Sequence, residues 1–273
     1  MKSISAQNES ELGGRSSILA RQKRDHMRLD GLLRRLGEAP AAGRNPVLLD
    51  IYRLVFPHAF AEEAVLWPLI RRLLPDGQAL TLQVELEHQR INALVTELET
   101  LEPGSEAHEQ RLVRIVQLLR EDVRDEEDAL LPRLQAELSP AQLRLLGVCW
   151  EIVRAIAPTR AHPIVSRRPP GNVLSALPLA LLDRLRDAVD SSLQQNAGGG
   201  APRLRRLSSA LARASHAVER LPGMRRGEDP ATRVRRGSGA PWRAAAFLAI
   251  GAGSAALLFA SRRRRGATLG VAG

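Results

Sequence analysis

HAFAEEAVLWP at residues 58–68 has a related counterpart in the chain, DVRDEEDALLP at residues 122–132, and this repeat indicates the fold. The two begin 64 positions apart, and each places a glutamate four residues after its first residue. A second pair repeats at a distance of 62 positions, since HMRLDGLL at residues 26–33 resembles HQRINALV at residues 88–95. Two similar helical hairpins in tandem predict a pseudo-twofold bundle in which equivalent positions meet at the centre.

The helices that carry these motifs are bounded by turn residues. Apolar periodicity, with breaks at proline and glycine, predicts four long helices and a shorter fifth one, with Ser105 and Ser139 as N-caps of the last two. Pro57 and Pro68 are expected to bend the second helix. The expected helices span residues 16–38, 46–74, 79–101, 106–138 and 141–156. The residues expected to pack the fifth helix across the bundle are Leu143, Leu146, Val148 and Trp150.

Charge divides the chain at about residue 160. The first 160 residues hold 21 basic and 24 acidic residues, a net charge of −3, and the remainder holds 19 basic and 6 acidic residues, a net charge of +13. A near-neutral bundle followed by a basic region is therefore expected. Amphipathic patterns predict helices in that region at residues 173–195 and 203–221. The second is expected to lie on anionic lipid or against a partner.

Residues 244–261, AAAFLAIGAGSAALLFAS, contain no charged side chain. As a helix they would be about 27 Å long, enough to cross the hydrocarbon core of a bilayer. Trp242 and Arg243 on one side and Arg262–Arg265 on the other suit anchoring at the interfaces. We therefore expect a single C-terminal transmembrane helix with membrane localisation. Because no secretory signal is evident near the N-terminus, the bundle is expected in the cytoplasm.

The same basic flanks bear on partners and on domain organisation. Attraction to anionic lipid explains the arginines, and with only 3% aromatic residues no specific nucleic-acid binding is expected. The fold class predicted is all-α, an up-down-up-down four-helix bundle with an additional packed helix. The expected parts are a flexible N-terminus at 1–15, the bundle at 16–138, the additional helix at 139–160, a basic linker with amphipathic helices at 161–243, the transmembrane helix at 244–261 and a basic tail at 262–273.

Six side chains of the repeated motifs are candidate metal ligands. Residues four positions apart project from one face of a helix, so Glu62 lies below His58, and Glu126 below Asp122. Apolar neighbours predict that these groups point into the core, where ionisable groups are costly unless paired or bound to metal. Carboxylates from opposed helices can bridge two cations, and mixed nitrogen and oxygen ligation suits iron, manganese or zinc. The candidate ligands are His26, His58, Glu62, His88, Asp122 and Glu126.

Other chemistry-bearing residues are less informative. Glu63 and Glu127 follow two of the candidate ligands, and the pattern leaves open whether they support imidazoles or face solvent. His108 is expected on the surface, while His162 and His216 have no partners at ligand spacing. A single cysteine, Cys149, excludes a disulfide within the chain and cysteine-based zinc or iron–sulfur sites.

These motifs resemble the hemerythrin-like (HHE) cation-binding family, whose pattern is a histidine on the first helix, H-x-x-x-E on the second, a histidine on the third and H-x-x-x-E on the fourth. The resemblance covers about residues 16–138, and residues 157–172 are similar to extended bacterial members. It implies two non-haem irons, with manganese or zinc as alternatives. Asp122 stands where the family places its last histidine, which leaves open a weakened metal position or a mononuclear site. The ligands that the resemblance implies are His26, His58, Glu62, His88 and Glu126.

Three classes of function remain open. In the first, the iron centre of a membrane-tethered protein binds oxygen or nitric oxide, or senses iron or redox state. In the second, it is an enzyme that decomposes peroxide, although no separate acid–base pair or substrate motif is visible. In the third, the protein is a metal-free, membrane-anchored helical adaptor whose protein partner the sequence does not indicate.

Overall fold

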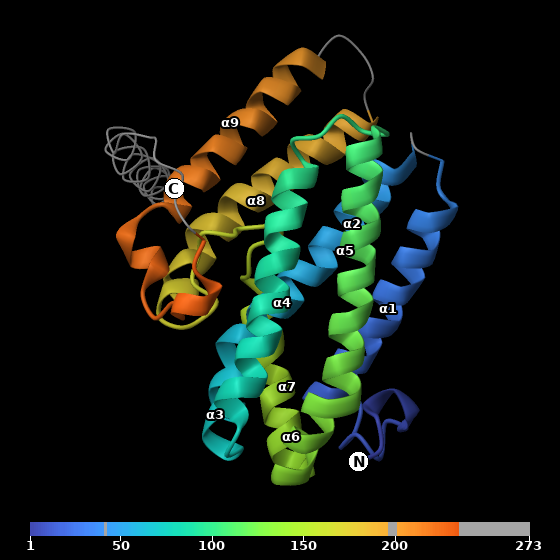
Figure 1. Cartoon of the computed structure of the whole chain (residues 1–273), viewed down its shortest axis with the longest axis vertical. Helices are drawn as coiled ribbons and strands as arrows, with labels where there is room; N and C mark the ends of the chain where they lie inside the picture. Colours follow the sequence, from blue (N-terminus) through green and yellow to red (C-terminus); the bar gives the residue numbers. More distant parts are fainter. Residues whose placement is uncertain (41–42, 196–200, 235–273) are drawn as a thin grey trace, which may run out of the picture. The chain divides into compact units, whose positions relative to one another are not determined.

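The computed structural model describes residues 1–40, 43–195 and 201–234, and Met1–Val234 form one compact unit. Four long helices form the bundle, and Figure 1 shows them running side by side. The first packs against the second and the third against the fourth, and all regular elements among the described residues are helical. The predicted all-α bundle is therefore confirmed. The four helices are α1 (Ile18–Glu38), α2 (Arg44–Ala61), α4 (Gly77–Leu98) and α5 (Glu106–Asp125).

The second and fourth expected helices each contain one π turn. Glu62–Leu66 form it between α2 and α3 (Trp67–Leu73), and Glu126–Leu130 form it between α5 and α6 (Leu131–Glu137). The equivalent place of the two turns follows the sequence repeat. π turns inside α-helices are frequent at functional sites.

A proline explains where each π turn lies. Pro68 and Pro132 are each the second residue after one of the two turns. Proline has no N–H, and in an α-helix its ring would clash with the carbonyl four residues earlier, so a wider turn relieves the strain. The hydrogen bond that closes the first turn accordingly runs from the N–H of Trp67 to the carbonyl of Glu62, five residues back.

Serine residues define where several helices begin. The hydroxyl of Ser105 accepts a hydrogen bond from the N–H of His108, which confirms it as the N-cap of α5. Ser139 and Gln142 form a reciprocal capping box at the start of α7 (Pro140–Ala155). These local signals make the boundaries of the two helices readable from the sequence.

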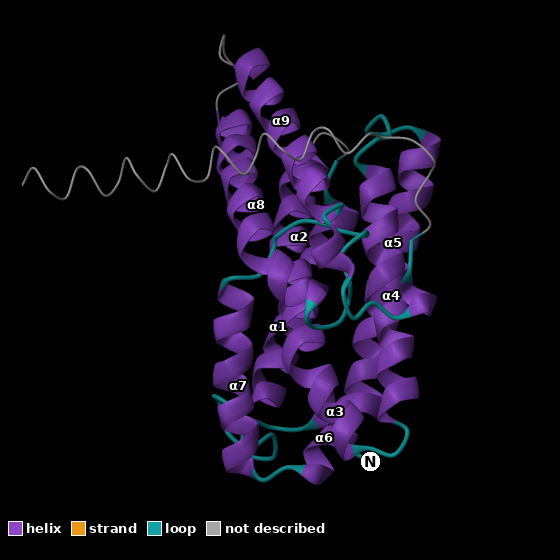
Figure 2. Cartoon of the chain, turned by 90° about the vertical axis from the view of Figure 1, so that its left-hand side faces the viewer, coloured by secondary structure: helices purple, strands orange, loops and turns teal. Residues whose placement is uncertain are grey.

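The additional helix, α7, packs against α1 and α2, as Figure 2 shows from the side. Leu143 and Trp150 are buried, but Val148 is 47% exposed, so its predicted place in the interface is wrong. Gly147 supplies the reason, because a Cβ there would lie 2.2 Å from the carbonyl oxygen of Ser16. α7 therefore comes closest to the backbone at Ser16 through Gly147. Val148, the next residue, points about 100° away from this contact.

Buried apolar side chains form two clusters along the bundle. In α1, Ile18 and Leu19 belong to the cluster that also contains Trp67, whereas Leu29 and Leu33 belong to the other. Five of the six candidate ligands lie between the two clusters in sequence order on their helices, and Glu62 directly follows Ala61, the first residue of the second cluster on its helix. The bundle thus has a polar layer enclosed between apolar layers.

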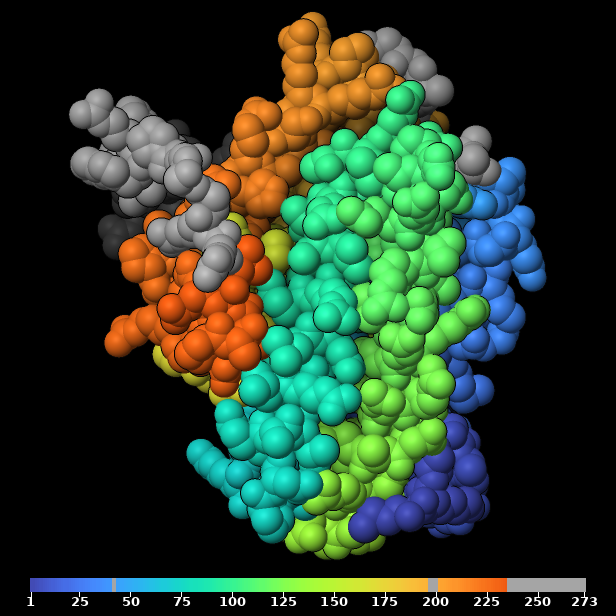
Figure 3. Space-filling view, viewed as in Figure 1, coloured from blue at the N-terminus to red at the C-terminus, as the bar shows by residue number. Residues whose placement is uncertain are grey.

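The N-terminal residues, expected to be flexible, lie against one end of the bundle. Ile4 and Leu12 are buried in the apolar cluster there. Gln7 donates from Nε2 to Oε1 of Gln135 at 3.0 Å. Figure 3 shows this segment in dark blue beside the green residues of the α6 region.

The basic region contains the expected amphipathic helices, α8 (Gly171–Gln195) and α9 (Ala201–Glu219), which pack against each other. Leu204, Leu211 and Val218 on α9 are half-buried, whereas neighbouring arginines are exposed. The nearest partner of this apolar stripe is therefore α8 of the same chain. Among the described residues, no helix is long and apolar enough to cross a membrane. The expected transmembrane helix at 244–261 and the tail at 262–273 lie outside the described residues.

Candidate metal centre

The polar layer contains all six predicted ligands, and each is less than a tenth exposed. They come from four different helices and from both π turns, so the tertiary fold alone brings them together. Their donor atoms form two groups that overlap in one residue. The first group is His26, His58, Glu62 and Glu126, and the second is His88, Asp122 and Glu126.

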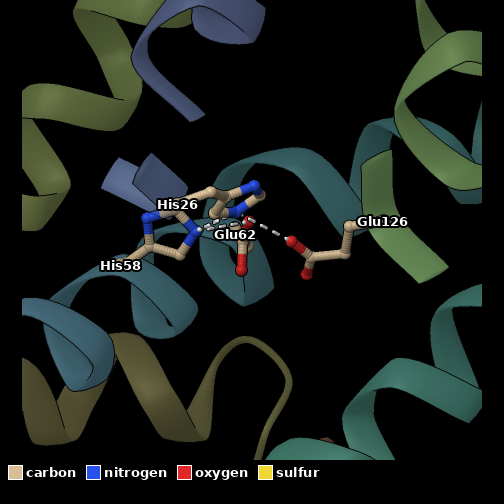
Figure 4. A group of neighbouring side chains, drawn as sticks. All are labelled: His26, His58, Glu62 and Glu126. Carbon is tan, nitrogen blue, oxygen red and sulfur yellow. Dashed lines mark hydrogen bonds and ion pairs between the residues drawn. The ribbon is translucent and has the colours of Figure 1, made fainter. Parts of the chain in front are cut away.

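In the first group, two imidazoles face two carboxylates (Figure 4). The Nε2 atoms of His26 and His58 are 3.3 Å apart. Nε2 of His58 lies 3.1 Å from Oε1 of Glu62, and Nε2 of His26 lies 3.3 Å from Oε2 of Glu126. All four donor atoms lie within 4.8 Å of one another, close enough to surround one cation.

In the second group, one imidazole meets an oxygen-rich set of donors. Nε2 of His88 lies 3.5 Å from Oδ1 of Asp122 and 3.9 Å from Oε1 of Glu126. Oε2 of Glu62 is also 3.9 Å from His88 Nε2. The two glutamates therefore lie between the groups, each with one oxygen near either side.

Each of the three histidines is held by a second carboxylate on its outer side. An imidazole whose Nδ1–H donates to an acid presents the lone pair of Nε2 on the opposite side, which is how metal-binding histidines are oriented. The acids that accept are neither surface groups nor ligands, but form a shell around the centre. The pairs are His26 with Glu127 at 3.0 Å, His58 with Asp25 at 3.2 Å and His88 with Glu63 at 3.0 Å.

Unsatisfied atoms indicate that the arrangement fits cations. Both carboxylate oxygens of Glu62, Oδ1 of Asp122 and Oε1 of Glu126 are buried without a hydrogen-bond partner. Although Oε1 of Glu62 is 3.1 Å from an imidazole nitrogen, no hydrogen bond joins the two atoms. Buried polar groups are normally satisfied. Cations between these atoms would satisfy them, and the mixed nitrogen and oxygen donors suit iron, manganese or zinc.

The acids also hold protons on the imidazoles when no metal is bound. Burial lowers the pKa of His26, but Glu126 and Glu127 outweigh it and raise the pKa to about 9. Burial likewise opposes the charge of His58, whose pKa Glu62 and Asp25 raise to about 10. The pKa of His88 is raised well above its usual value, because Asp122 and Glu63 overcome the effect of burial.

Glu126, the carboxylic acid that belongs to both groups of donor atoms, has a pKa above its usual value. Burial raises the pKa of Glu126 to about 8, and the nearby charges of Glu62 and Asp122 add to the effect. The centre therefore keeps protons at neutral pH that a metal ion must displace.

The two halves differ at Asp122, the position where the sequence pattern departs from H-x-x-x-E. Shifting Asp25, which holds His58, by 62 positions leads to Glu87. Burial and the charge of Asp122 raise the pKa of Glu87, and its Oε2 is buried without a partner. The carboxylate that would support a fourth histidine is thus present, but the imidazole is not.

The sequence pattern leaves the roles of Glu63 and Glu127 open and does not indicate Asp25. Glu63 and Glu127 follow ligands directly, and in a regular α-helix successive residues point about 100° apart. The π turns bring both glutamates of each pair inward, so that Glu63 is 1% exposed. The proline six residues after each pair's first glutamate was the signal for this turn. Asp25 had only its place next to His26 to suggest a role.

His108 lies elsewhere than expected, and His162 has partners that are distant in sequence. His108 is buried rather than on the surface, because it lies on the inner side of the first turn of α5. His162 is buried between Asp183 and Glu219, 3.0 Å from each. Its partners are 21 and 57 positions away in sequence, so no local spacing could indicate them.

The comparisons with known proteins agree with this geometry. Residues 17–134 match the model of the hemerythrin HHE cation binding domain. An uncharacterized hemerythrin-like protein of Schizosaccharomyces pombe is 23% identical over 134 residues, which are 49% of this chain and 66%, just under two thirds, of the relative. No solved structure matches the chain. The residues that match the hemerythrin HHE cation binding domain, 17–134, thus contain all six ligand candidates.

Proposed function

We propose that this domain binds two non-haem iron ions and uses them to bind or sense a small molecule such as oxygen or nitric oxide. One observation carries the proposal: Glu126 belongs to both groups of converging donor atoms. A carboxylate with one oxygen toward each group is suited to bridge two cations. Bound iron would supply redox chemistry and open coordination positions, while the protein's residues fix its place and exclude bulk water.

The surroundings of the centre favour a very small ligand. A cavity of 20 Å³ lies beside His26, His58 and Asp122, with a lining that includes Leu29 and Leu119. That is more than the roughly 10–15 Å³ that one water molecule needs, but far below the several hundred Å³ of a typical metabolite pocket. A diatomic gas fits this space, and an organic substrate does not.

We also propose that residues after 234 tether the domain to a membrane from the cytoplasmic side. The support is the uncharged sequence at 244–261 with its flanking arginines, which can interact with lipid headgroups. Sedimentation with membranes would test the tether. The full chain is expected in the carbonate-washed membrane fraction, and a chain ending at Val234 in the supernatant. Recovery of the full chain in the supernatant would overturn this part of the proposal.

Metal analysis of the purified full chain tests the iron centre. About two irons per chain are expected, with near-ultraviolet absorption from the oxidised pair. His58→Ala should lose iron, whereas His108→Ala, a buried histidine outside the centre, should retain it. A folded wild-type chain that binds no metal after anaerobic loading would support the adaptor instead.

Ligand titration then separates binding from catalysis. Spectral changes with oxygen or nitric oxide, without turnover, are expected for a carrier or sensor. Rapid peroxide decomposition that disappears in His58→Ala would instead support the enzyme. The two results are distinguished by whether product accumulates beyond one equivalent per centre.

A further inference from the structure

Two arginines from outside the matched domain contact the outer carboxylates of the centre. Arg154 lies on α7, and Arg167 lies in the segment between α7 and α8, both beyond residue 134. Nη1 of Arg154 donates to Oδ2 of Asp25 at 3.1 Å. Nη1 of Arg167 lies 3.7 Å from Oε1 of Glu63, which is fully buried.

In each case the arginine and a ligand histidine share one oxygen. Oδ2 of Asp25 also lies 3.2 Å from Nδ1 of His58. Oε1 of Glu63 also lies 3.0 Å from Nδ1 of His88. A positive charge on that oxygen competes with the imidazole for its electrons, so the arginine acts on the metal ligand through the acid.

Arg154 is held in place by its own neighbours. Nη2 of Arg154 donates to Oε1 of Glu151 at 2.7 Å, and its guanidinium lies 4.9 Å from the centre of the Trp150 ring. The Trp150 ring in turn meets the His58 ring edge-on at 5.3 Å. Since α7 packs against α1 and α2, its place in the bundle holds Arg154 and Trp150 beside His58.

Arg167 is even more enclosed. Its Nη2 donates to the carbonyl oxygens of His162 and Val165 at 2.6 and 3.2 Å. Its side chain is 9% exposed, against 26% for Arg154. A buried, anchored cation next to a buried acid acts through a lower dielectric than an exposed one, so Arg167 should have the larger effect.

With two divalent cations bound, the two arginines would balance the charges of the centre. Three ligand carboxylates and three outer carboxylates carry six negative charges. Two divalent cations supply four positive charges, and the two guanidinium groups supply the remaining two. Glu87 stays outside this count, because it belongs to neither group of donor atoms and its hydrogen-bond partner is Gln83. Uncompensated charge in a buried layer is costly.

We propose that Arg154 and Arg167 are positioning residues of the metal centre, through which the extension beyond the matched domain sets the reduction potential of the bound iron. The inference rests on the proposed iron binding. Removing a positive charge favours the more highly charged oxidised metal, so the potential should fall. The substituted residues touch no metal ligand directly, and iron content should stay near that of the wild type.

The test is the reduction potential of the iron-loaded full chain, followed optically. Arg167→Gln should lower the potential and Arg154→Gln should lower it less, while lysine at either position should restore much of the difference. Arg168→Gln is the matched control for Arg167, because Arg168 pairs with Glu85 and Asp229 and not with the outer acids. Arg144→Gln is the control on α7, since Arg144 binds the carbonyl of Gly13.

A second variant covers the case in which Arg167→Gln does not fold. Glu63→Gln alone should raise the potential, and adding Arg167→Gln should return it toward the wild-type value, because the pair then loses no net charge. Potentials that are equal in wild type, Arg167→Gln and Arg154→Gln, or unchanged by Arg167→Gln in the Glu63→Gln chain, would overturn the inference. A wild-type chain that binds no iron would instead refute the proposed function.

Discussion

The two halves of the bundle repeat one motif but complete it differently. The first half supplies His26, His58 and Glu62, and the second supplies His88, Asp122 and Glu126. One imidazole of the second half is replaced by a carboxylate, so its cation position is richer in oxygen. A repeat in sequence therefore specifies equivalent places for side chains without making the two metal positions chemically equal.

Two of the three outer acids connect the halves, whereas Asp25 holds His58 within the first half. Glu63 of the first half holds His88 of the second, and Glu127 of the second holds His26 of the first. The two π turns make this exchange because each directs one glutamate to the centre and the next to a histidine of the other half. The comparison teaches that the centre is one unit built across the pseudo-twofold axis.

Substitution of Glu126, the carboxylate that belongs to both groups of donor atoms, should have the largest effect on metal binding. Glu126→Ala removes a donor from both groups, so metal content should fall from about two ions to fewer than one per chain. Elemental analysis of the purified chain measures this. Glu127→Ala, which leaves every ligand in place, should still bind two ions. Retention of two ions by the first variant would mean that the halves do not share a ligand.

The two groups of donor atoms should release different numbers of protons when they bind a metal ion. A metal ion that binds to the first group must displace protons from His26 and His58, whose pKa values are about 9 and 10. A metal ion that binds to the second group meets one histidine. Affinity of the first group should therefore rise more than tenfold per pH unit between about pH 6.5 and 9, and that of the second less steeply. Competition titrations at pH 6, 7 and 8 measure both. Equal slopes would contradict the assignment.

The same shifts predict how the metal-free fold responds to pH. A histidine whose pKa is raised on folding stabilises the fold fully below its unfolded value of about 6.5, and this contribution is lost as pH rises through the folded value. The metal-free chain should thus melt at a lower temperature as pH increases from about 6.5 to 9–10. Metal-loaded protein should lack this trend, because its imidazoles carry no extra proton.

The exchange of outer acids gives a paired prediction of smaller size. Glu63→Gln should lower the affinity for the ion beside His88 by about 10–100-fold. Glu127→Gln should lower the affinity for the ion beside His26. The effect of Glu127→Gln should be smaller, because its side chain is 13% exposed and water can replace the lost contact. Step-resolved metal titrations tell the two ions apart. Loss of the opposite ion in each variant would refute the crossed pairing.

The smallest expected change is the one that makes the halves alike. Asp122→His places an imidazole where Glu87 already provides an unpartnered buried oxygen. The second ion should bind about tenfold more tightly, in the range that such supported ligands contribute. Asp122→Asn, which adds no imidazole, should weaken that ion. If the histidine variant binds no better than the asparagine variant, Glu87 does not support a ligand at this position.

Much of the domain could be read from the chain because the relevant signals are local. Ser105 and Ser139 cap helices with groups three residues away, and His58 and Glu62 share a face by helical spacing alone. The burial of Val148 was mispredicted because apolarity does not say which face a neighbour approaches. Gly147 decided that face through its contact with the backbone at Ser16.

The four-helix bundle, its internal repeat and the six residues that converge in its core are predictable from the amino-acid sequence, because periodicity and spacing fix which side chains share a helix face. The packing of the helices, in contrast, places Glu126 in both groups and pairs Glu63 and Glu127 with histidines of the other half. It also brings Arg154 and Arg167 to the centre from beyond the matched residues. Those contacts join residues up to 129 positions apart, and only the packing of whole helices sets such distances.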